Sequence, residues 1–323
     1  MLNDAINLKT KQQLALLGCV VVSVISIVLG LLFGSVENAA GTLIVELRLP
    51  RVLTAFSIGA LLATTGNLLQ IYTRNPLAEP SVLGISSGAS VGALLALIFG
   101  FTVWVGAWIG AIIVLILLLR LAGGFSASSD RLLLAGVMLG TACGALISLI
   151  LTLTPESVLP GILHWLMGDL QGATEWGGAS VFLLFSALLI ALFWWYSGSI
   201  GLLPLGWDKV KSLGIDVGRL RLIIIGGSSL AVAVCVSIAG TIGFVGLVVP
   251  HAIRLFFPRS LASNQSWMIP ACALVGGTLL VLADLISRTI LAPSELPVGV
   301  ITAAIGVPVF LYLLGRQQDW RGR

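Results

Sequence analysis

A succession of long apolar stretches, separated by short polar connections, constrains the fold of this 323-residue chain more than any other feature. Most stretches have the roughly 17 to 25 residues with which a helix crosses about 30 Å of hydrocarbon. Backbone in lipid must satisfy its own hydrogen bonds, and these runs lack the alternation of a membrane barrel. We therefore predict an all-α integral membrane protein with ten transmembrane helices. The stretches lie near residues 14–33, 52–72, 83–100, 103–121, 132–153, 178–197, 222–239, 241–257, 268–290 and 298–315.

The composition agrees with a membrane location. Hydrophobic residues make up 58% of the chain and charged residues only 9%, against about 25% charged in soluble domains. The sequence pI near 9.1 therefore reports membrane topology rather than a nucleic-acid partner. All four cysteines fall inside apolar runs, where we interpret them as packing residues rather than metal ligands or disulfides: Cys19, Cys143, Cys235 and Cys272.

The basic residues predict the orientation of the chain. With ten spans and a cytoplasmic N-terminus, both termini are cytoplasmic, and the inner side receives 14 of the 17 lysines and arginines. The first stretch is too long for a signal peptide and has no Ala-x-Ala cleavage site, so we expect it to remain as an anchor. The inner set is Lys9, Lys11, Arg74, Arg120, Arg131, Lys209, Lys211, Arg219, Arg221, Arg254, Arg259, Arg316, Arg321 and Arg323.

The three remaining basic residues, Arg48, Arg51 and Arg288, fall on the predicted outer side. Arginines at the ends of spans can reach the headgroups without any protein partner. As a sparse positive patch, however, the three also suit the docking of an acidic protein. Asp284 and Arg288 are spaced i, i+4, so an intrahelical ion pair competes with docking at that position.

The longest cytoplasmic connection, residues 202–221, predicts a short helix from Trp207 to Leu213 that ends at Gly214. Its basic residues could rest on anionic headgroups. Its apolar residues instead favour a helix-in-groove contact with another protein. We expect these apolar residues to form one side: Leu205, Trp207, Val210 and Leu213.

Polar and small residues within the spans predict helix packing. Thr64, Asn67 and Gln70 recur every three residues on one face, which favours interhelical hydrogen bonds over substrate contact. Regular glycine spacing predicts close backbone approach at Gly84, Gly88 and Gly92 and again at Gly240, Gly243 and Gly246. His164 and His251 lack companion ligands, so no metal site is expected.

Several long motifs, in order from about residue 47 to 315, resemble the permease subunits of ABC importers for iron-siderophores, haem and cobalamin (FecCD/BtuC-like). The motifs are "RLPRVL" (48–53), "NPLAEPSVLGISSGASVGAL" (75–94), "RLLLAGVMLG" (131–140), "HWLMGDL" (164–170), "LGWDKVKSLGIDVGRLR" (205–221), "AGTIGFVGLVVPHAIRL" (239–255) and "ELPVGVITAAIGVPVFLYLL" (295–314). The resemblance implies a single permease domain over 1–323, in the cytoplasmic (inner) membrane. It also implies three kinds of partner: a second permease copy or sister permease, two ABC ATPase subunits, and an external substrate-binding protein.

The resemblance also assigns roles to particular residues. It makes Arg48, Arg51 and Arg288 docking sites for the binding protein. It places a cytoplasmic gate in the stretch 123–131, at Ser128, Ser129 and Asp130, although an ordinary loop would have the same composition. The coupling helix that seats in the ATPase comprises Leu205, Gly206, Trp207, Asp208, Val210, Leu213 and Gly214. The family commonly has an acidic residue and an alanine where this chain has Trp207 and Val210.

Catalysis is expected elsewhere. The chain has no G-x-x-x-x-G-K-[ST] phosphate loop, so it should bind no cofactor itself, and ATP and Mg should bind to the partner ATPases. The rival class, a self-sufficient secondary transporter, normally has ionisable residues at mid-membrane, and only Asp284 is expected within a span. Ferric siderophore, the commonest family cargo, is the first expectation for the substrate. Cobalamin follows, favoured by "NPLAEP" and "HWLMG", and haem is third.

Overall fold

The computed structural model describes residues 2–34, 41–124, 129–173 and 175–321, and every regular element in these ranges is a helix. Seven helical segments in these ranges are long and apolar enough to cross a membrane. Three of them are whole helices: α5 (Val103–Ala122), α8 (Trp176–Trp195) and α15 (Gln265–Thr289). Two are parts of helices: Thr10–Leu32 in α1 (Leu2–Leu32) and Asp130–Leu153 in α6 (Ser129–Leu153). Two join consecutive elements: Ile44–Thr73 comprises η1 (Ile44–Arg48) and α3 (Leu49–Thr73), and Val217–Ala239 comprises α11 (Val217–Arg221), η5 (Leu222–Gly226) and α12 (Gly227–Ala239).

The other three predicted spans correspond to shorter apolar helices. They are α4 (Ile85–Ile98), α13 (Val245–Phe256) and the apolar part, Val298–Tyr312, of α16 (Val298–Arg321). At 1.5 Å per residue, α4 covers about 21 Å and α13 about 18 Å, less than the hydrocarbon thickness of about 30 Å. The all-helical architecture is therefore confirmed, whereas ten complete crossings remain a prediction.

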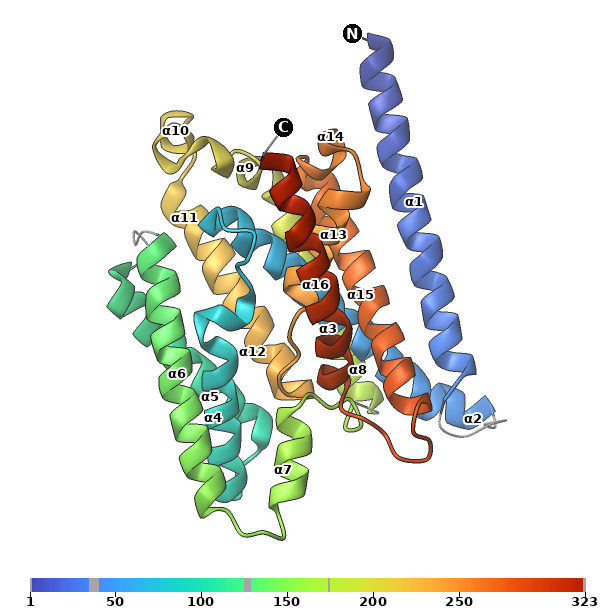
Figure 1. The fold of residues 1–323 in the computed structure, drawn as a ribbon, viewed down its shortest axis with the longest axis vertical. Coiled ribbons are helices and arrows are strands. Elements are labelled where there is room, and N and C mark those ends of the chain that lie inside the picture. Colours follow the sequence, from blue (N-terminus) through green and yellow to red (C-terminus); the bar gives the residue numbers. More distant parts are fainter. Residues whose placement is uncertain (1, 35–40, 125–128, 174, 322–323) are drawn as a thin grey trace.

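Short helices connect the longer ones and mark the two ends of the molecule. The start of α1, the end of α16, α10 (Trp207–Ser212) and α14 (Arg259–Ala262) lie at one end, called here the inner end. The opposite, outer end carries α2 (Gly41–Leu43) and α7 (Leu159–Leu166) (Figure 1). The remaining connecting helices are η2 (Pro80–Leu83), α9 (Ser197–Ile200) and η4 (Leu203–Leu205).

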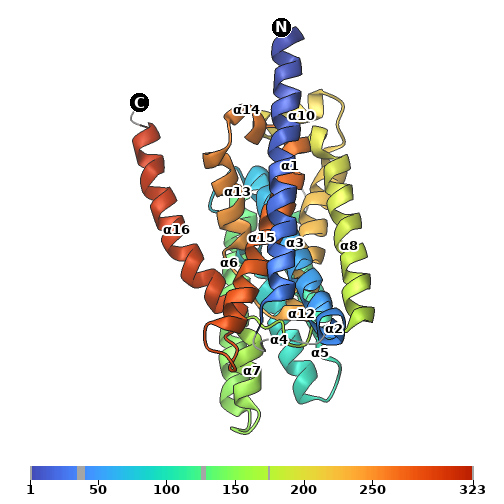
Figure 2. The same ribbon diagram turned by 90° about the vertical axis from the view of Figure 1, so that its right-hand side faces the viewer.

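Helix α3 forms the centre of the fold. Pro50 starts it in the first turn, where its missing N–H costs nothing, and Arg74 ends it in a left-handed conformation. Nearly all of its 25 residues are buried, and it packs against α15, α13, α8 and α12. By contrast, α1 and α6 lie at opposite edges of the molecule (Figure 1). Few of their residues are buried, as expected for helices that face lipid or another subunit, and Figure 2 shows α1 standing in front of the other helices.

Glycines allow the central helices to approach closely. A Cβ added at Gly66 of α3 would lie 2.0 Å from the carbonyl oxygen of Gly246 in α13, and one added at Gly92 of α4 would lie 2.1 Å from that of Gly106 in α5. The predicted close packing is thus confirmed at Gly92 and Gly246. It is wrong at Gly243, whose nearest neighbour would be a side-chain oxygen 3.8 Å away, because Gly243 lies in the connection before α13 rather than in a helix contact.

Candidate functional site

The outer end contains a buried cluster of ion pairs centred on Asp284. The Arg51 guanidinium donates through Nε and Nη2 to Asp284 Oδ1, at 3.0 and 2.9 Å. The Arg288 guanidinium lies on the other carboxylate oxygen, with Nε 3.0 Å from Asp284 Oδ2. Asp284 is fully buried, so this one carboxylate neutralises charge from both α3 and α15.

Glu295 and the end of α1 complete the outer cluster. Arg51 Nη1 donates to Glu295 Oε2 at 2.9 Å, which joins α3 to the segment before α16. Arg48 Nη1 donates to the carbonyls of Leu31 and Leu32, both at 3.1 Å. Arg288 Nη2 donates similarly to the Gly30 carbonyl, at 3.2 Å, and carbonyls at a helix C-terminus favour such cations. The cluster therefore fastens three helices at the outer end.

This geometry corrects the expected exposed patch. Arg51 is 8% exposed and Arg288 3% exposed, and only Arg48 is half-buried. The intrahelical pair between Asp284 and Arg288, weighed against docking from the sequence, is present. Both guanidiniums are buried without leaving a bare charge away from water, which would be costly, because they share the buried Asp284 carboxylate. A docking role for the three arginines is a separate question and stays a prediction.

The coupling segment at the inner end is built from η4, α10 and α11. Gly206 enters α10 at φ 108°, and Gly214 follows it at φ 81°, both in the region that favours glycine. Leu205 and Leu213 are exposed, at 53% and 59%, together with Asp208 and Gly214. The observed helix is one residue shorter than predicted, because α10 ends at Ser212.

The four apolar residues of this segment do not share one side, contrary to our expectation. Val210 is completely buried in the chain's own core. The Trp207 ring packs edge-on against Tyr72 of α3, with centroids 5.2 Å apart, and lies under the Arg221 guanidinium at 4.4 Å. Val210 thus packs inside its own chain and Trp207 faces largely inward, while the coupling role of the segment stays a prediction. Trp207 and Val210 are the two residues that differ from the family pattern, and both pack against other parts of this chain.

The expected gate residues are only partly within the described structure. Ser128 lies outside the described residues, and the side chain of Ser129 does too. Asp130 is exposed in the first turn of α6, where a carboxylate is favoured by the helix dipole.

The polar face of α3 makes the expected interhelical hydrogen bonds. Asn67 donates to Gln265 Oε1 of α15 at 2.9 Å and accepts from Arg254 Nη2 of α13 at 2.8 Å. Gln70 also accepts from Arg254 and donates to the Gly246 carbonyl. The prediction is confirmed for Asn67 and Gln70, which hold a largely enclosed arginine between three helices. Thr64 Oγ1, by contrast, is buried without a hydrogen-bond partner among the described residues.

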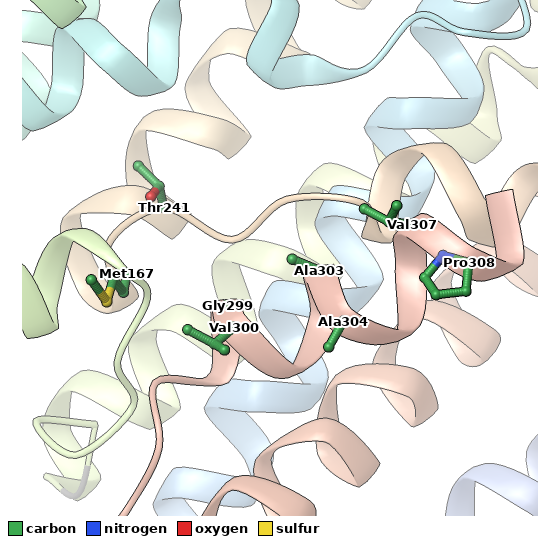
Figure 3. Close-up of a pocket in the computed structure, with 8 residues that line it drawn as sticks. All are labelled: Met167, Thr241, Gly299, Val300, Ala303, Ala304, Val307 and Pro308. Atoms are coloured by element: carbon green, nitrogen blue, oxygen red, sulfur yellow. The ribbon is translucent and has the colours of Figure 1, made fainter. Parts of the chain in front are cut away.

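An apolar hollow of about 680 Å³ lies between α16 and the connections around Met167 and Thr241. Figure 3 shows its lining residues, Met167, Thr241, Gly299, Val300, Ala303, Ala304, Val307 and Pro308, arriving from three segments. Thr241 Oγ1 donates to the Leu166 carbonyl, and the amide of Asp169 donates to the Ala239 carbonyl at 2.8 Å. All eight lining residues are uncharged, and all but Thr241 are apolar.

Sequence reasoning missed Glu79, which approaches the start of α13. Its Oε1 accepts from the Phe244 amide at 2.6 Å, and Phe244 itself has φ 68°, uncommon for a residue with a side chain. A Cβ on Gly246 would meet both Pro80 and Leu62, so the turn that carries Glu79 lies beside the middle of α3. Glu79 is therefore, like Asp284, an acidic residue packed among the apolar helices, and a contact between positions 165 apart leaves no signal in the sequence.

No group of three or more His, Cys, Asp or Glu side chains that could hold a metal occurs in the described part of the chain. His164 lies 3.8 Å from Asp169, and His251 packs edge-on against Phe310. The four cysteines are buried and free, as expected for packing residues. Together the long apolar helices and the uncharged hollow define a class: a multi-pass membrane protein with an apolar recess beside α16.

The chain belongs to the FecCD transport family, whose model matches residues 13–316. It is 39% identical over 294 residues to the uncharacterized ABC transporter permease protein YvrB of Bacillus subtilis, covering 88% of this chain and 82% of that one. It is 37% identical over 277 residues to the vitamin B12 import system permease protein BtuC of Escherichia coli O157:H7, covering 83% and 82%.

Solved structures agree with this assignment. The fold matches a metal-chelate type ABC transporter in an inward-facing conformation with a TM-score of 0.85 and 32% identity, covering 94% of this chain and 99% of that one. PsaBC from Streptococcus pneumoniae shares the fold at a TM-score of 0.58, with 18% identity and coverage of 81% and 89%. The chain is thus a non-catalytic permease subunit of an ABC importer in the inner membrane, and ATP is hydrolysed by partner subunits.

Proposed function

We propose that this permease imports a bulky metal chelate, handed over by an external binding protein. The observation that carries the proposal is the hollow beside α16, whose small uncharged walls suit a cargo that must pass without adhering. Ferric siderophore is the first candidate because it is the commonest cargo of such importers. Cobalamin is the second, and the 37% identity to a vitamin B12 import permease specifically favours it.

The exposed residues of the coupling segment support a contact between this segment and the ATPase. Leu205 and Leu213 present apolar surface to the solvent at the inner end, where Asp208 and Lys209 are exposed as well. Exposed leucines suit an apolar contact with a groove on another protein better than they suit a basic loop on headgroups. We therefore assign Leu205 and Leu213 to the contact, together with the exposed residues between them.

The outer cluster supports docking of the binding protein. Three arginines and two carboxylates leave it with one net positive charge, which attracts an acidic surface. Arg48 is the least buried of the three arginines and offers the simplest contact. Asp130, with Ser128 and Ser129, is proposed to form the gate at the inner mouth.

Uptake by reconstituted complexes tests the proposal. The tagged chain, purified with its copurifying ATPases and binding protein, is placed in liposomes and offered ⁵⁵Fe-labelled ferric hydroxamate, cyanocobalamin or haem in separate assays. We expect ATP-dependent uptake of one class only, with the same chelate found on the binding protein by mass spectrometry. Uptake that proceeds without ATP under an imposed ion gradient would instead establish a secondary transporter.

A further inference from the structure

Glu295 is the accessible acid of the outer cluster. It lies between α15 and α16, at the end of a connection whose residues 290–294 are exposed. Its side chain is 17% exposed, whereas Asp284 is completely buried. Of the carboxylate contacts described in the cluster, the one between Glu295 and Arg51 is therefore nearest to the solvent.

The donors of Arg51 are divided between these two acids. Nε and Nη2 point to Asp284, which also pairs with Arg288 and lies beyond the reach of an external group. Nη1 points to Glu295. Of these two contacts, the one on the Nη1 edge is the more exposed, so a carboxylate that arrives from outside would meet Arg51 on the edge that Glu295 occupies. Arg51 must therefore exchange one carboxylate for another if it is to dock a partner.

We propose that Glu295 is an internal competitor: it pairs with Arg51 in the undocked permease and is displaced when an acidic side chain of the external binding protein takes its place. The proposal rests on the docking function proposed above. An exchange keeps the guanidinium paired at each stage, which avoids the cost of leaving a buried charge bare. It also explains how a residue that is 8% exposed can serve an interface.

The position of Glu295 gives the exchange a consequence inside the membrane. The Leu296 amide donates to the Ser287 carbonyl at 3.0 Å, and α16 begins at Val298. Gly299 and Val300, in the first turn of α16, line the hollow. Displacing Glu295 thus breaks the ion pair that links the segment before the N-terminus of α16 to α3.

Binding measurements on three forms of the complex test this. Wild type, Glu295→Gln and the control Glu46→Gln are each assembled with their ATPases in nanodiscs and titrated with the separately purified external binding protein. Glu46 is exposed on η1, so the control removes the same charge from the outer end without touching the Arg51 contact. Removing the competitor should tighten binding about two- to fivefold in Glu295→Gln only, as expected for one accessible ion pair.

The outcomes separate the two proposals. Binding by Glu295→Gln that is unchanged or weaker than wild type overturns the exchange while leaving docking intact. Equal tightening by Glu46→Gln also overturns it, since general electrostatics would then suffice. No binding by the wild-type complex overturns docking and the exchange with it.

A measurement without the partner gives an independent test. In undocked Glu295→Gln, amide hydrogen exchange of residues 291–297 should be several times faster than in wild type or Glu46→Gln, because the Arg51 tie is gone. Unchanged exchange rates in this segment would show that Glu295 does not hold it.

Discussion

Replacing Asp284 with asparagine should destabilise the permease more than any other single charge removal in the outer cluster. Asp284 is completely buried, and two guanidiniums lie about 3 Å from its oxygens. Without its charge, Arg51 keeps Glu295, whereas the hydrogen bonds described for Arg288 go to backbone carbonyls. Breaking one buried pair costs about 3 to 5 kcal/mol, mostly because the partner is left uncompensated. We expect the free energy of unfolding of Asp284→Asn to fall by about 3 to 5 kcal/mol.

The assay is the free energy of unfolding in detergent micelles, from denaturant titrations followed by the fluorescence of the nine tryptophans. The matched control is the double variant Asp284→Asn with Arg288→Met, which removes the stranded cation and leaves Arg51 paired with Glu295. It should recover to within about 2 kcal/mol of wild type, a coupling typical of residues in one network. Two results would contradict this expectation. The first is a loss of unfolding free energy below about 1 kcal/mol in Asp284→Asn, as for an exposed pair. The second is a loss in the double variant equal to the sum of the losses caused by the two single changes.

Three further predictions follow from the packing and the proposed interfaces. Leu213→Asp should leave the fold intact, because the side chain is 59% exposed, but weaken ATPase capture at least about tenfold through lost apolar burial; wild-type yield of copurified ATPase would contradict the seat. Gly66→Ala should lower the unfolding free energy by about 1 to 3 kcal/mol, since the new Cβ would overlap the Gly246 carbonyl, whereas Gly144→Ala, which meets nothing within 4 Å, should not. Arg48→Glu should slow association of the external binding protein at low salt and lose that effect near 0.5 M salt; salt-independent association would leave headgroup anchoring as the role of Arg48.

Most of the helical fold could be predicted from the sequence because a bilayer leaves the backbone few alternatives. Hydropathy could not show that α4 and α13 are shorter than a full crossing. Their flanking residues are still apolar, and the break before α13 depends on Glu79, which reaches it from a turn 165 residues earlier in the chain. Such a long-range contact leaves no periodic signal.

The candidate sites divide in the same way. The spacing of Asp284 and Arg288 was readable as an i, i+4 pair, but the contact from Arg51 spans 233 positions and only the fold shows it. In the coupling segment, helical periodicity placed Val210 and Leu213 on one side. That prediction was wrong because both leucines lie outside the helix. Leu213 follows the last residue of α10, Ser212, and Leu205 precedes the turn at Gly206, so helical spacing does not set their direction.

Helix α3 reaches from the outer cluster to the coupling segment without a break. Its first turn contains Arg51, and its last turn places Tyr72 against Trp207. A rigid rod of 25 residues is about 37 Å long, so a tilt of about 5° about its midpoint moves its two ends by about 1.6 Å in opposite directions. Gly59, near the middle of α3, packs directly on the Gly276 backbone of α15 and can act as the pivot of this tilt. Displacement of Trp207 at one surface of the membrane would then shift the guanidinium of Arg51 at the other.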